Sequence, residues 1–258
     1  SSLLSQSSRA LWIKPYTLYG IRDRTLIAKG EQAHVLEAPD GITWLNLNAS
    51  SADAAITHLR ARGFQPFGPF RFPEPEEGKA EPTPWYFKLG GIVDSAVPGR
   101  DVYFIEYNEP LIEQSRRKDP AATVRRQTHA NGAEGIHSVW IGVKDLDEAM
   151  KTYERMGFER GRMLKFAAVN ATARELPAGR GTILLVQPAN IGSPASAWLG
   201  DRPHRLMGLS IKVTNVAIAG ELLAAKHRLS TRPYQGLYGK SILVSPTAAG
   251  GVWIEFFE

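Results

Sequence analysis

The feature that most constrains the fold of this chain is a repeated pattern of strand, turn, helix and glycine. Residues 136–158 (IHSVWIGVKDLDEAMKTYERMGF) predict a strand, a polar turn at Asp145, an amphipathic helix and a helix-ending Gly157. Residues 42–64 superpose on this stretch without a gap, at a spacing of 94 residues (141 − 47), and place Gly63 where the helix should end. Because the same roles recur in the same order, we interpret the two stretches as copies of one module.

A third copy begins near Leu206, at a spacing of 70 residues from the second (213 − 143). The same spacing places residues 251–255 (GVWIE) on residues 181–185 (GTILL), and both segments are typical of a module's last strand. In the first copy that strand is VYFIEY, residues 102–107. The sequence alone equates its Glu106 with Glu255 of the third copy.

The first copy is longer than the others, by about 15 residues when its last strand is compared with that of the second. We place the extra residues in the Pro- and Glu-rich loop 72–84, because proline is excluded from central strands. This loop is expected to be a surface excursion, with a lid over an active site as the alternative.

These copies predict an α+β fold of paired βαβββ modules that form curled mixed sheets. Residues 11–21 (LWIKPYTLYGI) look like the last strand of a further module whose front is missing, so two tandem cups are expected, the first of them incomplete. The expected domains are a first cup at 1–108, a linker at 109–132 and a second cup at 133–258. Module exchange between chains would complete the first cup, so a homodimer is an expected partner state.

The composition is ordinary for a globular chain, with 43% hydrophobic residues and a formal net charge of +5. No apolar run approaches the roughly 18 residues of a membrane helix, so no membrane partner is expected. The basic residues are scattered, and the densest run, residues 116–118, is typical of a solvated face, so no nucleic-acid partner is expected. The absence of cysteine excludes disulfides and thiol catalysis and fits a cytoplasmic protein. The chain starts at Ser1 without methionine, so a removed signal and a periplasmic location stay open.

The repeat resembles the vicinal oxygen chelate superfamily, and within it the glyoxalase-like proteins with tandem cups. The resemblance spans most of residues 11–258 and is carried by WLNLN…DAAITHLRARGF, VYFIEYNEP, HANGAEGIHSVWIGVKDLDEAMKTYERMGF, SPASAWLGDRPHRLMGLSIKV and YGKSILVSPTAAGGVWIEFFE. It implies that two modules curl one eight-stranded sheet around a cavity. Isomerases, dioxygenases, hydrolases and non-catalytic drug-binding proteins share this fold, so the fold alone does not fix the chemistry.

The resemblance also implies where a divalent metal would bind, since metal-using members take His and Glu ligands from the first and last strands of paired modules. In the second cup those positions match His137, Leu185, Met207 and Glu255. The first cup offers Thr17, Thr43 and Glu106. The expected metal ligands are therefore His137 and Glu255, an incomplete set, and no other cofactor is implied. His137 is alternatively a half-buried strand histidine without a metal.

Two carboxylates are the expected catalytic bases. Glu106 and Glu255 each interrupt an apolar strand, where a lone carboxylate costs several kcal/mol unless it is paired, protonated or metal-bound. Desolvation would raise the pKa of such a group toward the range of a general base, with His137 assisting. The alternative is that each Glu faces solvent or an arginine.

Two groups of side chains are candidates for a ligand pocket. In the first cup they are the aromatic residues and the threonine beside them, namely Thr43, Trp44, Trp85, Phe87 and Tyr103, which could equally be ordinary core. In the last module a polar strand entry could meet an anionic ligand, through Tyr234, Tyr238, Lys240 and Ser241.

The first functional interpretation is a glyoxalase-like enzyme of lyase or isomerase type, with dioxygenase-like chemistry as an alternative enzyme class. It would act on an oxygenated or carbonyl-bearing metabolite by proton abstraction next to the carbonyl. The alternative is a non-catalytic protein that sequesters an aromatic or cationic compound in the same cup. A third interpretation is a structural role, with the cup filled by side chains.

Overall fold

A computed structural model describes residues 42, 44–73, 84–121, 124 and 128–258. The strands in this part of the chain are β1 (Leu45–Asn48), β2 (Phe67–Phe72), β3 (Phe87–Val93), β4 (Asp101–Tyr107), β5 (Ala133–Val143), β6 (Met163–Phe166), β7 (Ala171–Ala178), β8 (Gly181–Pro188), β9 (His204–Val213), β10 (Tyr234–Gln235), β11 (Lys240–Val244) and β12 (Trp253–Phe257). The helices are α1 (Ala52–Ala61), α2 (Glu109–Lys118), α4 (Leu146–Met156), α5 (Pro194–Leu199) and α6 (Val216–His227), with a 3-10 turn at Ala167–Val169. The predicted strand at 11–21, together with Thr17 and Thr43, lies outside the described residues.

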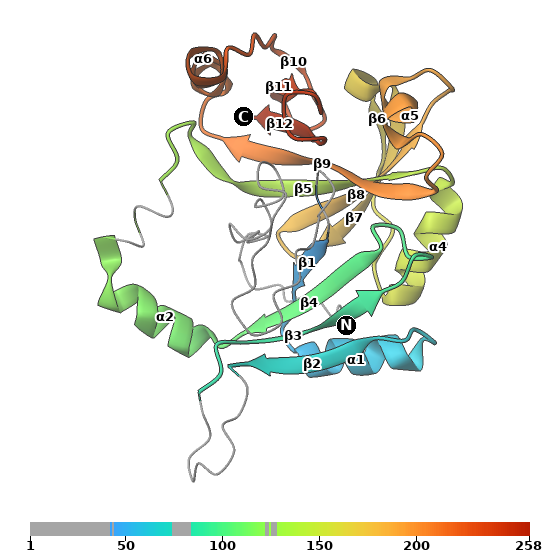
Figure 1. Ribbon diagram of the computed structural model, residues 1–258, viewed down its shortest axis with the longest axis vertical. Helices are drawn as coiled ribbons and strands as arrows, with labels where there is room; N and C mark the ends of the chain where they lie inside the picture. Colours follow the sequence, from blue (N-terminus) through green and yellow to red (C-terminus); the bar gives the residue numbers. More distant parts are fainter. Residues whose placement is uncertain (1–41, 43, 74–83, 122–123, 125–127) are drawn as a thin grey trace, which may run out of the picture.

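The strands form two sheets that confirm the predicted modules. The first sheet has the order β1-β4-β3-β2, with β1 parallel to β4. The second has the order β10-β11-β12-β9-β5-β8-β7-β6, and its two modules join through antiparallel pairing of β5 with β9. In Figure 1 the strands at its ends, β6 and β10–β12, rise on the same side of β5 and β9, so this sheet curls into a half-barrel.

The predicted linker contains a helix. Helix α2 occupies Glu109–Lys118, directly after β4, and none of its residues is buried. It lies apart from both sheets in Figure 1. No helix in the described part of the chain is long and apolar enough to cross a membrane.

Each of the three modules in the described part of the chain starts its helix with two acceptors of the same kind. The residue before the helix caps it: the side chains of Ser51, Asp145 and Asn215 accept backbone N–H groups of the first turn. A second acceptor comes from the end of the module and accepts the N–H of the helix's first residue. These second bonds run from Ala52 to Glu106 (2.9 Å), from Leu146 to Gln187 (3.1 Å) and from Val216 to Glu258 (2.8 Å).

Strand register corrects the equivalence drawn between Glu106 and Glu255. The first and last strands of the three modules pair Asn46 with Tyr103, Trp140 with Leu184, and Ser210 with Glu255. The first-strand residues of these pairs follow the 94- and 70-residue spacings, so the counterparts of Glu255 are Leu184 and Tyr103. Leu185 lies one residue from the equivalent position, and Glu106 lies three residues from it. A shift by an odd number of residues places a side chain on the opposite face of the sheet, so neither is the counterpart of Glu255.

The core joins both sheets. One buried cluster contains α1, α4 and one face of each sheet, with Leu47 and Phe104 from the first sheet and Ile141 and Leu185 from the second. The Tyr153 hydroxyl donates to the carbonyl oxygen of Pro98 at 2.8 Å, which ties α4 to the β3–β4 turn. The opposite face of the eight-stranded sheet is therefore left to line the half-barrel.

Candidate active site in the second cup

The inner face of the half-barrel, here called the cup face, carries every second residue of its strands. Cross-strand pairing places six of them on this face: Ser138, Trp140, Leu184, Ser210, Trp253 and Glu255. A second buried cluster fills it, built around Trp140, Phe166 and Leu184, with Leu237, Tyr238 and Trp253 packed against it. The Trp140 and Phe166 rings meet edge to face, with centroids 4.6 Å apart.

Glu255 lies on the cup face with none of its surface exposed to solvent. The Tyr234 hydroxyl donates to its Oε1 at 2.6 Å, and the Ser210 hydroxyl donates to its Oε2 at 2.7 Å. The backbone N–H of Leu237 also donates to this carboxylate. Burial raises the pKa of Glu255 above its ordinary value, although these hydrogen bonds oppose the rise. A carboxylate in this state is suited to accept a proton.

A chain of hydrogen bonds extends from Glu255 along the cup face. The Trp140 indole N–H lies 3.0 Å from the Ser210 hydroxyl oxygen and 3.2 Å from that of Ser138. Ser138, Ser210 and Ser241 are all fully buried. The Ser241 hydroxyl lies beside the carboxylate and can donate either to it or to the Gly239 carbonyl oxygen, 3.0 Å away. The network holds the Glu255 carboxylate in one orientation.

The segment Tyr234–Gly239 covers this carboxylate. Gly236 lies so close that a Cβ atom there would stand 2.5 Å from Glu255 Oε1, and it would also collide with the Ser241 hydroxyl. The Tyr238 ring contacts those of His137 and Phe257, with centroid distances of 4.3 Å and 5.1 Å. Burial raises the pKa of Tyr238 to about 12. In this conformation the cup is closed over Glu255.

His137 sits at a β-bulge, where the register between β5 and β9 shifts between Ile136 and Ser138. Its ring contacts Tyr238 and Phe257 edge to face. Burial lowers the pKa of His137, which favours the neutral imidazole. The histidine therefore lies at the rim of the cup and contacts the segment that covers Glu255.

The donors around Glu255 do not fit a divalent metal. No group of three or more His, Cys, Asp or Glu side chains that could hold a metal occurs among the described residues. The side chains that reach the carboxylate are hydroxyls, from Ser210 and Tyr234, and they donate to it. Leu184 stands at the position equivalent to Glu255 in the preceding module. A metal held by His137 and Glu255 stays a prediction without a third ligand in this part of the chain.

Glu106 lies elsewhere and has a structural environment. Its Oε2 accepts the N–H of Ala52 at the start of α1 and lies 3.6 Å from the Lys88 ammonium nitrogen. Lys88 also bonds Asp53 at 2.6 Å. Glu106 thus faces the helix of its module, on the opposite side of the sheet from Tyr103. Its role as a base stays an untested prediction that this geometry does not favour.

The residues of the first predicted ligand pocket are spread along the four-stranded sheet. Trp44 and Tyr103 have ring centroids 6.4 Å apart, whereas Phe87 stacks on Phe72 at 4.8 Å, four residues further along the strand pair. The Lys88 ammonium lies 5.1 Å above the Trp85 ring. Tyr238 belongs to the second cup.

Lys240 lies at the base of α6, where it pairs with Glu258 at 3.2 Å. The polar residues predicted around it therefore lie in two places, because Tyr234 and Ser241 contact Glu255 instead. Ser138 and Ser210 were not among the predicted site residues. Both lie on the cup face of their strands, and the alternation of side chains between the two faces of a strand could have identified them.

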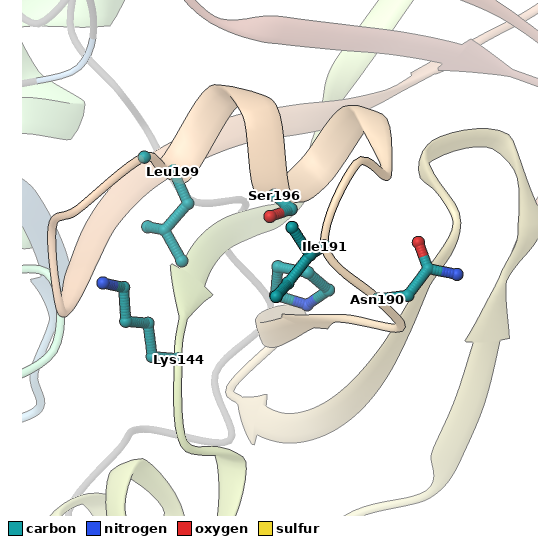
Figure 2. A pocket seen from close by; sticks show the side chains of 7 residues that line it. Lys144, Asn190, Ile191, Ser196 and Leu199 are labelled. Atoms are coloured by element: carbon teal, nitrogen blue, oxygen red, sulfur yellow. The ribbon is translucent and has the colours of Figure 1, made fainter.

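A separate depression of about 320 Å³ lies outside the cup, beside α5. Figure 2 shows Lys144 and Leu199 on one side of it and Asn190 and Ile191 on the other. None of the side chains that contact Glu255 lines this depression.

No protein-family model matches the chain, and no curated protein matches it. Among solved structures, the chain is similar to methylmalonyl-CoA epimerase from Mycobacterium tuberculosis, with 21% identity, 52% of this chain and 93% of the other covered, and a TM-score of 0.45. A hypothetical protein from Bacillus halodurans has 19% identity, coverage of 47% and 91%, and a TM-score of 0.40. A Streptomyces coelicolor methylmalonyl-CoA epimerase variant in complex with 2-nitronate-propionyl-CoA has 20% identity, coverage of 47% and 94%, and a TM-score of 0.41. These are similarities of fold alone.

Proposed function

We propose that the second cup binds a small carbonyl-bearing molecule and that Glu255 removes a proton from the carbon next to its carbonyl. The observation that carries this proposal is the position of Glu255, a carboxylate with no exposed surface on the inner face of a half-barrel. Burial, with hydroxyl and backbone N–H groups rather than a cation as its partners within the described part of the chain, raises its pKa toward the range in which a carboxylate is an effective base. The reaction class is isomerase- or lyase-type.

The proton transfer can be written with this chain's own groups. A Glu255 oxygen takes the proton, the C–H electron pair forms a carbon–carbon double bond, and the carbonyl π pair moves to oxygen. Trp253 supplies a donor for that enolate oxygen, because its indole N–H is buried without a hydrogen-bond partner within the described part of the chain. Trp253 precedes Glu255 by two residues, so both side chains leave the same face of β12. Return of the proton to another face or atom completes an isomerisation.

Hydrogen exchange at carbon tests this proposal. Carbonyl-bearing metabolites that raise the Tm of the protein would be incubated with it in D₂O, and loss of the C–H signal would be followed by ¹H NMR. We expect exchange with the wild type, and exchange slower by about a hundredfold or more with Glu255→Gln. Glu106→Gln is the matched control and should exchange at the wild-type rate. Exchange that survives in Glu255→Gln, or that is lost in Glu106→Gln, would contradict the assignment of Glu255.

A second candidate function is sequestration without turnover. It is favoured by the aromatic lining of the cup, where Trp140, Phe166, Tyr238 and Trp253 belong to one cluster. A compound that raises the Tm of wild type and Glu255→Gln alike, with no carbon exchange in either, would support this function instead.

A further inference from the structure

The segment Tyr234–Gly239 is joined to the sheet by few bonds. Strand β10 is two residues long, lies at the edge of the sheet, and pairs with β11 only through Tyr234–Ser241 and Gln235–Lys240. The residues after β10 form a turn with its own hydrogen bond, in which the Gly236 N–H donates to the Gly239 carbonyl oxygen at 2.8 Å. Displacing this turn would break that short ladder and the turn's hydrogen bonds to Glu255 and Ser241, and it would leave the pairing of β11, β12 and β9 intact.

The same turn fills the cup. Leu237 and Tyr238 pack against the cluster on the cup face, and Tyr238 also lies against His137 and Phe257. These two side chains come from the turn after β10, whereas the rest of that cluster comes from the other strands of the sheet, the 3-10 turn and α5. They occupy the space that a small molecule would need in order to reach Glu255.

The polar groups of the turn satisfy the carboxylate. The Tyr234 hydroxyl and the Leu237 N–H donate to Glu255, and Gly236 has no Cβ to hold the turn away from it. If the turn leaves, both donors leave with it. An incoming molecule must then replace them, because a buried carboxylate without its hydrogen bonds is costly.

We propose that the Tyr234–Gly239 turn is a plug that occupies the ligand site, and that the ligand which displaces it combines a flat apolar group with N–H or O–H donors. The apolar group takes the place of Leu237 and Tyr238, and the donors take the place of the Tyr234 hydroxyl and the Leu237 N–H. This inference rests on the proposed function, because both concern the same site. It addresses how a ligand enters the cup and which class of ligand binds there, not the proton transfer.

Amide hydrogen exchange of the whole chain, with benzamidine as probe, tests the plug. Benzamidine has a flat ring and a fork of N–H donors, and it lacks a carbonyl, so no turnover is involved. We expect the amide of Leu237, which donates to Glu255, to exchange faster than that of Phe256 in β12, because the turn opens without global unfolding. Benzamidine should accelerate the turn amides further, by about tenfold at saturation. Benzoate, with the same ring and no donor, should leave them unchanged.

Variants make the test specific to the plug. Glu255→Gln should lose the response to benzamidine, and Tyr234→Phe should raise turn exchange about tenfold without any probe, since it removes one bond to the carboxylate. Tyr86→Phe, at an exposed tyrosine directly before β3 of the other sheet, is the control and should change neither. Turn amides that exchange together with Phe256, or that benzamidine slows, would overturn the plug. Equal effects of benzamidine and benzoate would overturn the ligand class. Failure of carbon exchange with normal plug opening would count against the proposed function alone.

Discussion

Replacement of Glu255 separates its two contributions to stability, as a hydrogen-bond acceptor and as a buried charge. Glu255→Gln keeps one acceptor oxygen, and the Ser210 and Tyr234 hydroxyls can rotate to accept from the new amide. Glu255→Ala removes the acceptor and leaves these two hydroxyls and the Leu237 N–H without a partner. The two variants therefore differ in unpaired donors, whereas both lack the charge.

The magnitudes follow from the burial of this network. Each buried donor without an acceptor costs about 1–3 kcal/mol, so three of them give Glu255→Ala a loss of about 3–9 kcal/mol in the free energy of unfolding. Glu255→Gln should lose about 1 kcal/mol at low pH, where the native carboxyl is protonated. Because burial raises the pKa of Glu255 above the 4.5 of the unfolded chain, the folded protein binds this proton more tightly. Wild-type stability relative to Glu255→Gln should therefore fall as pH rises from about 4.5 through the raised pKa, by about 1.4 kcal/mol per pH unit, and then level off.

Urea denaturation of the wild type and both variants, at half-unit steps from pH 4 to pH 8, measures these differences. Comparing the wild type with Glu255→Gln cancels the titration of the other carboxyls, which both proteins share. A difference that stays constant across this range would refute a raised pKa for Glu255. A difference that grows in favour of the wild type as pH rises would indicate a carboxylate stabilised by its hydrogen bonds.

Three further predictions follow from the contacts of the modules and of the cup. Glu106→Ala should lower the free energy of unfolding by about 1–2 kcal/mol, because Ala52 at the start of α1 loses its acceptor, and Glu106→Gln should lose less in the same urea titration. A Glu106→Ala protein as stable as the wild type would contradict this structural role. Gly236→Ala should lower the Tm, since its Cβ collides with the Glu255 carboxylate, whereas Gly220→Ala in α6 meets Thr231 Oγ at 3.2 Å and should be neutral or stabilising. Equal Tm changes in the two glycine variants would argue against close packing of the turn. Dialysis against EDTA should leave the Tm unchanged, because the donors around Glu255 do not fit a metal. A Tm that EDTA lowers and that Zn²⁺ or Mn²⁺ restores would contradict this prediction.

The repeat predicted the modules because periodicity is a local property of the chain. The spacing of 94 residues placed α1 and α4 correctly, with Ser51 and Asp145 before them and Gly63 and Gly157 after. The prediction of a curled eight-stranded sheet followed from pairing two such modules, and strand order confirms it.

The candidate site was predicted less well, because the face of a strand depends on single-residue register. The last strands of the second and third modules are 71 residues apart in register (255 − 184), not the 70 that the first strands follow, so Leu185 was matched in place of Leu184. The bulge at His137 leaves no trace in the apolar pattern, and the histidine therefore looked like a residue of the regular strand. Glu255 is buried, in keeping with the local signal of a charge inside an apolar strand, and its role as a base stays a prediction.

The shared core has a consequence for any attempt to study the cups apart. Arg155 of α4 lies 4.2 Å above the Phe64 ring, and Gly99 of the β3–β4 turn fits against Ile141 and Tyr153. A fragment starting at Ala133 would keep the whole eight-stranded sheet but present this apolar side of α4 and β5 to water. We expect such a fragment to self-associate or precipitate, so ligand binding by the second cup should be measured on the intact chain.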